Sequence, residues 1–245
     1  MHACERPRGV KGAVKGLVQH INAFRFAARF DIASYYDSIQ HHTLLDLLDK
    51  AGVEESFRAL VRQYLELPDQ KRTGRGMVAG SGLSPLLGAL YLLPLDDAMD
   101  RLTAKTGLYY VRYMDDMLIL AKTRWHLRTA IRELIGVTLS LGLELHQKKR
   151  FIGRIDNGFD FLGYRIHPSR KLRTSTESLQ RLATRARRLY EQGAETCRLR
   201  QYVTRWTHWL WGGLDGHVSR KGGLRRYLVF VLKQLQIGGV SLPRR

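Results

Sequence analysis

The chain has 245 residues, of which 44% are hydrophobic and 26% charged, which is typical of one large or two small globular domains and excludes a disordered or low-complexity protein. No apolar run is long enough to span a membrane, and residues 1–8 lack a signal-peptide core, so we expect a cytoplasmic protein. Because only two cysteines are present, we expect neither disulfides nor a structural zinc site. The net charge of +19, with 30 arginines among 41 basic residues, favours a nucleic-acid partner over a basic surface that only maintains solubility.

The N-terminal half alternates helical patterns with one short buried strand. A basic, glycine-dotted segment through residue 29 carries a short helical pattern. Ser84-Pro85 is a strong helix start, because a hydroxyl precedes a proline whose φ is already helical. In order, we expect a strand at 27–32, helices at 43–51 and 56–67 (the second ended by Pro68), a Gly/Ser loop at 71–82, and a helix at 84–105 kinked at Pro94.

The next segment contains the hairpin signals. Two apolar runs at 108–112 and 117–121 flank Asp115-Asp116, which predicts a hairpin with carboxylates at its tip. Thr123 is expected to cap a helix that ends at Gly142. Asn157-Gly158 is expected to join two further strands, at 151–155 and 159–166, in a second hairpin.

After Pro168 the sequence becomes helical and strongly basic. Residues 166–245 contain 17 Lys and Arg against 4 Asp and Glu, a net charge of +13. Three helical apolar patterns follow one another, the first opened by a predicted capping box of Thr174 and Glu177. A small bundle with a domain boundary near 167–173 is expected.

The polar residues that suggest chemistry lie far apart in the sequence. They are Asp31 at the end of a strand, Tyr36 five residues later, Gly80-Ser81 before the helix at Ser84, and the Asp115-Asp116 pair. Each has an ordinary explanation alone, since an acidic pair at a hairpin tip is usually a solvated turn. The ordered set is far more specific than its parts.

These residues resemble the right-handed polymerase palm of reverse transcriptases, closest to the bacterial type related to group II intron enzymes. Further matches are the segment 143–149, ending in Lys149, and a segment similar to the family's primer grip. The resemblance implies the following roles: catalytic carboxylates from Asp31 and Asp115, nucleotide binding by Tyr36, Gly80 and Ser81, and a primer grip formed by Phe161, Leu162, Gly163 and Tyr164.

The fold that the resemblance implies is α+β. It consists of an antiparallel palm sheet packed on helices at 27–167, a basic helical thumb at 168–245, and reduced fingers at 1–26. Only thirty residues precede Asp31, and Arg6, Arg8, Lys11 and Lys15 are weak substitutes for the basic residues that usually hold the triphosphate. Three readings stay open: minimal fingers, an N-terminally shortened reading frame, or a protein or structured RNA that completes the site.

Nucleotidyl transfer explains why acids would converge here. Two divalent ions stabilise the attacking and leaving oxygens of an in-line displacement, and Mg²⁺ prefers carboxylate oxygens. We expect two Mg²⁺ ions, with Mn²⁺ as a substitute, held by Asp31, Asp115 and, by resemblance, the Ile32 carbonyl. Asp116 is expected to act as an outer ligand or to orient the others. Lys149 is a candidate proton donor to pyrophosphate, against the rival reading that it belongs to a solvated basic run.

Tyr36 bears on the choice of nucleotide. The resemblance places this ring under the incoming sugar, where it excludes a 2′-hydroxyl and favours dNTPs; a core aromatic is the alternative. Two positions depart from the family: Val78-Ala79-Gly80 replaces a loop that commonly reads Pro-Gln-Gly, and Ala89 replaces a common Asn. These departures put fidelity and polymerisation efficiency in doubt, but metal binding is expected to be retained.

The function expected is RNA-directed DNA synthesis, with an RNA template, a DNA or RNA primer and dNTPs as partners, and no membrane. One alternative is a non-polymerising, maturase-like RNA-binding protein that uses the basic helices. The other is a truncated remnant of a mobile element. Retrohoming, sequence diversification and phage defence all stay open as biological roles.

Overall fold

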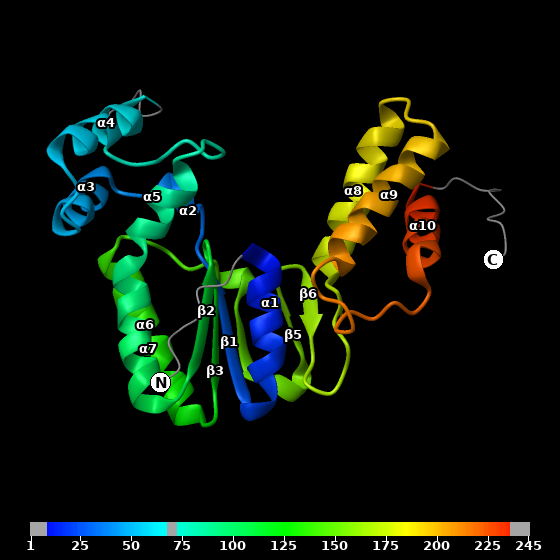
Figure 1. Cartoon of the computed structure of the whole chain (residues 1–245), viewed down its shortest axis with the longest axis horizontal. Helices are drawn as coiled ribbons and strands as arrows, with labels where there is room; N and C mark the ends of the chain where they lie inside the picture. Colours follow the sequence, from blue (N-terminus) through cyan, green and yellow to red (C-terminus); the bar gives the residue numbers. More distant parts are fainter. Residues whose placement is uncertain (1–8, 68–72, 236–245) are drawn as a thin grey trace. The chain divides into compact units, whose positions relative to one another are not determined.

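The computed structural model describes residues 9–67 and 73–235, with the helices and strands labelled in Figure 1. Packing divides the chain into two compact units, residues 1–155 and 156–245. Each unit combines helices with an antiparallel sheet, which confirms the predicted α+β fold. Within the described residues, no helix is long and apolar enough to cross a membrane.

The first unit is built on a four-stranded sheet with the order β2-β3-β1-β4, in which every neighbouring pair is antiparallel. The predicted strand at 27–32 and the predicted hairpin around Asp115 are both confirmed. The hairpin strands β2 and β3 pair with each other, and β1 lies between β3 and β4. The strands are β1 (Phe26–Asp31), β2 (Tyr109–Tyr113), β3 (Asp116–Ala121) and β4 (Phe151–Arg154).

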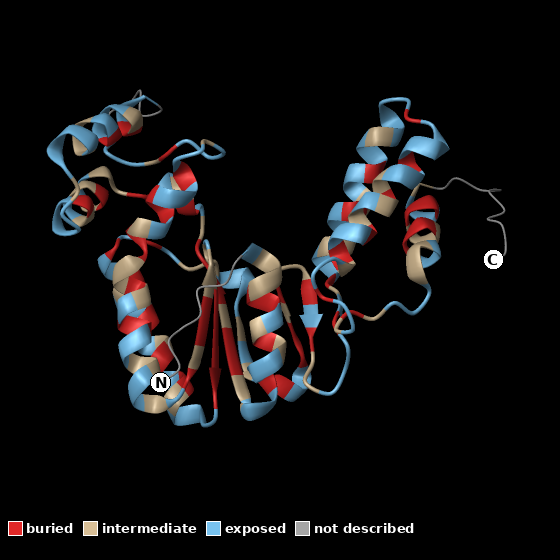
Figure 2. Cartoon of the chain, in the orientation of Figure 1, coloured by how far each residue is buried: buried red, intermediate tan, exposed pale blue. Residues whose placement is uncertain are grey.

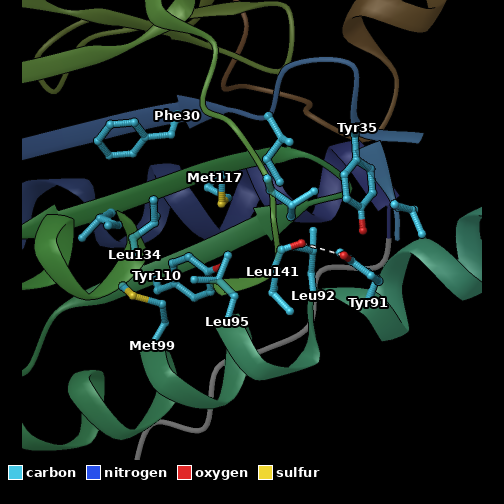
Figure 3. Close-up of a cluster of buried hydrophobic side chains, with 14 of the residues drawn as sticks. Phe30, Tyr35, Tyr91, Leu92, Leu95, Met99, Tyr110, Met117, Leu134 and Leu141 are labelled. Atoms are coloured by element: carbon cyan, nitrogen blue, oxygen red, sulfur yellow. Dashed lines mark hydrogen bonds between the residues drawn. The ribbon is translucent and has the colours of Figure 1, made fainter. Parts of the chain in front are cut away.

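Helices cover both faces of this sheet (Figure 1). On one face lies α1 (Gly9–His20), and on the other lie α6 (Leu93–Thr106) and α7 (Arg124–Ser140). Because side chains alternate along a strand, Phe30 and Met117 join the apolar cluster on the face of α6 and α7 (Figure 3). The two central strands, β1 and β3, are accordingly buried over most of their length (Figure 2), whereas the edge strands β2 and β4 are more exposed.

The predicted helices of the first unit form, with shifted boundaries. Those predicted from 43 and 56 begin at His41 and Glu55. Pro68, predicted to end the second, lies outside the described residues. Thr123 caps α7 as predicted, since its hydroxyl accepts a hydrogen bond from the His126 amide at 3.2 Å. The remaining helices of this unit are α2 (Tyr35–Ser38), α3 (His41–Lys50), α4 (Glu55–Glu66) and α5 (Ser84–Tyr91).

The prediction of one kinked helix from 84 to 105 is wrong. α5 ends at Tyr91, and α6 begins at Leu93 after a break at Leu92. Pro94 lies in the first turn of α6, where the missing amide hydrogen costs nothing because that amide has no partner within the helix. The proline therefore starts a new helix and does not bend the old one.

The second unit begins with a small sheet, and here the predicted Asn157-Gly158 hairpin is wrong. β4 pairs with β1, while β5 (Phe159–Phe161) pairs with β6 (Tyr164–Ile166), followed by β7 (Arg173–Thr174). The β5–β6 turn is Leu162-Gly163, with φ of 47° and 86°. Two consecutive positive φ angles suit a tight two-residue hairpin turn, so the predicted single strand at 159–166 folds back on itself.

Three helices complete the second unit: α8 (Thr176–Glu191), α9 (Thr196–Trp211) and α10 (Gly223–Gln234). They pack on one another through buried apolar residues, as the three patterns predicted. The predicted capping box is wrong by one residue, since Ser175 caps α8 by accepting from the Ser178 amide while Thr174 ends β7. The functional limits 1–26, 27–167 and 168–245 stay a prediction.

Candidate active site

Three aspartates meet at one end of the first sheet. Asp31 is the last residue of β1, and Asp116, the first residue of β3, is its cross-strand partner. Asp115 lies in the two-residue turn after Tyr113, beside Met114, whose φ is 54°. The β2–β3 hairpin thus brings Asp115 and Asp116 to Asp31, which lies more than eighty residues earlier in the sequence.

The electrostatics show that these carboxylates are close to one another. Burial raises the pKa of Asp115, and the neighbouring charges of Asp31 and Asp116 raise it further, while Lys149 lowers it. Burial also raises the pKa of Asp116, although Arg29 opposes that shift. Asp31 itself is only 7% exposed. Clustered, half-buried acids are costly unless a cation compensates them, so the cluster is suited to cation binding.

The donor set fits Mg²⁺ in one specific way. Within residues 9–67 and 73–235, no group of three or more His, Cys, Asp or Glu is placed so that it could hold a metal ion. Mg²⁺ in phosphoryl-transfer sites is commonly held by one or two carboxylates, with substrate phosphate and water completing its shell. The acids at this sheet end fit that partial set, in which substrate supplies the rest.

Arg29 pairs with Asp116. Its Nη2 and Nε both donate to Oδ1 of Asp116, at 2.8 and 3.3 Å, and the two side chains are 13% and 22% exposed. No motif in the sequence points to Arg29. A charged side chain inside a short buried strand, two positions before Asp31, was the signal available.

The segment that carries Lys149 is bound to the end of β1. The His146 amide donates to the Asp31 carbonyl at 2.7 Å, and the Ala33 amide donates to the Glu144 carbonyl at 2.8 Å. These two bonds lie on either side of the antiparallel bridge between Ile32 and Leu145. Ile32 is therefore a non-hydrogen-bonded position of the bridge, and its carbonyl is not used there.

Lys149 Nζ lies 3.4 Å from Oδ2 of Asp31. Lys149 stands in a run of three basic residues, between Lys148 and Arg150. Among the described residues, Lys149 is the one of the three that forms an ion pair with the acids. This contact brings Lys149 to the cluster; its chemical role stays a prediction.

Tyr36 lies beside the acids, in the short helix α2. Burial raises the pKa of its hydroxyl, and the charge of Asp115 raises it further. Its ring packs against Tyr35 at 5.5 Å, and a Cβ built on Gly88 of α5 would come within 3.3 Å of it. The sequence did not identify Gly88, because nothing local indicates that two tyrosine rings lie against it.

The glycine loop before α5 is held by hydroxyl groups. Gly80 has a φ of 92°, a conformation that suits glycine. The Tyr64 hydroxyl, from α4, bonds to Ser81 Oγ and lies 3.0 Å from Ser84 Oγ. Ser84 is fully buried and donates to the Val78 carbonyl. Tyr64 is a second residue that the sequence gave no reason to select.

The predicted primer grip lies in the second unit, at the β5–β6 turn. Phe161 and Tyr164 are fully buried, and Leu162-Gly163 form the turn itself. The Tyr164 hydroxyl donates to the Leu210 carbonyl at 2.7 Å, and its ring stacks on Trp209, which is 47% exposed. These contacts hold the turn against α9.

The chain is similar in sequence to a known protein family and to two known proteins. A family model described as "Reverse transcriptase (RNA-dependent DNA polymerase)" matches residues 2–166, about two thirds of the chain. Protein YkfC of Escherichia coli (strain K12) is 25% identical over 178 residues, and the match covers 58% of this chain and 47% of that protein. A retrovirus-related Pol polyprotein from the type-1 retrotransposable element R2 of Nasonia vitripennis is 26% identical over 142 residues, and the match covers 51% of this chain and 14% of that protein.

The solved structures support the fold. Telomerase from Candida albicans, determined in complex with a fragment of telomeric RNA, matches with a TM-score of 0.57. The match covers 93% of this chain and 44% of that one. At 14% identity, this similarity supports the fold alone. The chain spans less than half the length of each of these relatives.

Proposed function

Since the chain belongs to the reverse transcriptase (RNA-dependent DNA polymerase) family, we propose that it carries out RNA-directed DNA synthesis, by template-directed transfer of dNTPs to a primer. The observation that supports this most is the convergence of Asp31, Asp115 and Asp116 at one sheet end, with Lys149 beside them. Such a cluster has little structural value without a cation, because burial and mutual repulsion both disfavour the charged carboxylates.

The proposed cation site uses few protein ligands. The Asp31 and Asp115 carboxylates and the Ile32 carbonyl would hold two Mg²⁺ ions, with Mn²⁺ as a substitute, and Asp116 would act as a further ligand or orient the others. When bound, such a pair of ions stabilises the attacking and leaving oxygens of an in-line displacement. The Lys149 ammonium carries a proton at the edge of the same cluster and is the proposed donor to departing pyrophosphate.

The substrate side of the site is built by α2 and the glycine loop. Tyr36 presents its ring next to Asp115, where it would pack under the incoming sugar and exclude a 2′-hydroxyl. Gly80 and Ser81 would contact the nucleotide from a loop that the Tyr64 hydroxyl holds in place. This arrangement favours dNTPs over ribonucleotides on steric grounds.

The proposed partners are an RNA template and a DNA or RNA primer. Residues 166–245 carry a net charge of +13, and their arginines suit phosphate contacts. The primer grip at Phe161 to Tyr164 belongs to that unit. We also propose that the enzyme is of the bacterial, group II intron-like type. A protein or structured RNA would complete its fingers.

Primer extension tests this function. Purified chain with Mg²⁺, dNTPs and an RNA template annealed to a DNA primer should elongate the primer, and Asp115→Ala should abolish elongation. Asp100→Ala, an exposed acid of α6 in the same unit, is the matched control and should leave elongation within about two-fold of wild type, as a substitution on an exposed helix surface. Equal extension by wild type and Asp115→Ala refutes the assignment.

The charge of the second unit also favours a simpler function, RNA binding without synthesis, as in a maturase-like protein. In that case RNA would bind equally well to wild type and to the double variant Asp31→Ala/Asp115→Ala, and no primer would be elongated with either ion. A filter-binding titration beside the extension assay separates the two functions.

A further inference from the structure

Arg29 and the aspartates share one face of the sheet. Arg29 and Asp31 are two residues apart on β1, so their side chains lie on the same face. Asp116 is directly opposite Asp31 in the register of β1 and β3. The intervening Phe30 and Met117 lie in the apolar cluster on the other face (Figure 3), which establishes the alternation.

The contact between Arg29 and Asp116 is tight and shielded from water. Two guanidinium nitrogens of Arg29 donate to a single oxygen, Oδ1 of Asp116, at 2.8 and 3.3 Å. Both side chains are largely buried, at 13% and 22% exposed. Removing one member of a shielded pair leaves the other charge uncompensated, so Asp116 cannot leave Arg29 without a large cost.

The other two acids are held differently. Asp31 has a single contact of 3.4 Å to Lys149, whose side chain is 41% exposed and can move into solvent. Asp115 has no ion-pair partner within 4.0 Å among the described residues. A divalent cation can therefore replace the partner of Asp31 and bind Asp115 directly, whereas at Asp116 it would compete with Arg29.

We propose that Arg29 is a positioning residue that keeps Asp116 as its own counter-ion, so that Asp31 and Asp115 alone supply the carboxylates of the divalent-cation site. The inference rests on the proposed function and deepens it, because it gives two adjacent aspartates different roles. Asp115 binds the cation, and Asp116 together with Arg29 holds the first residue of β3 in place and limits the negative charge of the site.

Cation binding, measured without nucleotide or nucleic acid, tests this division. Mn²⁺ is titrated into the full chain and free Mn²⁺ is followed by electron paramagnetic resonance. Asp115→Asn should weaken binding at least about ten-fold, whereas Asp116→Asn should stay within about two-fold of wild type. Arg29→Met should tighten binding about ten-fold, because it removes a positive charge and frees a carboxylate. Arg29→Met/Asp116→Asn should return to the wild-type affinity.

Thermal unfolding of the metal-free protein supplies a second readout. Arg29→Met and Asp116→Asn should each lower Tm by about 5 °C, and the double variant should recover part of that loss. Leu118→Ala is the matched control, since Leu118 is the buried cross-strand partner of Arg29 and carries no charge. It should lower Tm and leave Mn²⁺ affinity unchanged.

Two results would overturn the inference: Asp116→Asn that weakens Mn²⁺ binding as much as Asp115→Asn, or Arg29→Met with wild-type affinity. A different result contradicts the proposed function itself. If Asp31→Asn and Asp115→Asn bind Mn²⁺ as wild type does, the cation site is absent. The Tm values of the Arg29 and Asp116 variants still report on the ion pair in that case, so the two failures are distinguishable.

Discussion

Gly88 is the position where one added methyl group tests how the proposed sugar-contacting ring is held. A Cβ at this residue would lie 3.2 Å from a ring carbon of Tyr35 and 3.3 Å from one of Tyr36, closer than the roughly 3.5–4.0 Å of ordinary carbon contacts. Gly88→Ala must therefore displace one or both rings by a few tenths of an ångström. The Tyr35 hydroxyl donates to the Gly88 carbonyl, which limits how far that ring can yield.

The free energy of unfolding separates the two effects of this methyl group. Replacing a glycine inside a helix by alanine gains about 1 kcal/mol, whereas overpacking a buried contact costs about 1–3 kcal/mol. Gly136→Ala in α7 is the control, because a Cβ there meets no atom within 4 Å. We expect Gly136→Ala to stabilise the protein and Gly88→Ala to be less stable than that control by about 1–3 kcal/mol in urea unfolding.

The same pair of variants tests the proposed role of Tyr36. Gly88→Ala should lower kcat/KM for dNTPs about ten-fold, because a small displacement of a positioning group costs much of its catalytic benefit. Gly136→Ala should retain the wild-type value. If Gly88→Ala is as stable as Gly136→Ala and extends primers equally well, the packing of Tyr36 against α5 does not control nucleotide addition.

Three further variants test other contacts. Tyr91→Phe should cost about 1–3 kcal/mol in urea unfolding, because its buried hydroxyl donates to a main-chain carbonyl at 2.6 Å (Figure 3), while the exposed Tyr190→Phe should be neutral. Lys149→Met should slow primer extension about 100-fold if it donates a proton, and Lys148→Met should not; equal losses would contradict the assignment. Burial lowers the pKa of Lys11 to about 8 from 10.5, so the unfolded state binds more protons in that window and stability should rise with pH there; Lys11→Met should remove the rise.

The sequence predicts best those features that depend on local patterns. Two apolar runs on either side of Asp115-Asp116 indicated the β2–β3 hairpin, and a hydroxyl followed by helical periodicity indicated the start of α7 at Thr123. In both cases the residues that determine the element lie within the element itself. Local patterns no longer predict the structure where two of them favour different elements.

The Asn157-Gly158 pair illustrates that competition. Asn-Gly favours a tight hairpin turn locally, but β4 pairs with β1, and the next hairpin turns at Leu162-Gly163 instead. Similarly, Pro94 was expected to bend a helix and starts a new one. Long-range pairing, which the local sequence does not encode, decides the first case, whereas the second follows from the tolerance of proline in the first turn of a helix.

The candidate site shows the same limit. Asp31 and Asp115 could be selected because their motifs follow one another in a recognisable order. Arg29, Tyr64 and Gly88 could not, since each acts through a contact with a residue distant in sequence. The bond from Tyr64 to the Ser81 hydroxyl exists only once α4 packs beside the glycine loop.

The most direct test of the central claim is a double-mutant cycle between Asp31 and Asp115 in primer extension. If both carboxylates hold the same pair of cations, Asp31→Asn and Asp115→Asn should each abolish most of the rate, and the double variant should be no slower than either one, because the residues act as a unit. Losses that multiply in the double variant, or one single variant that extends at the wild-type rate, would contradict the claim that the two acids share one site.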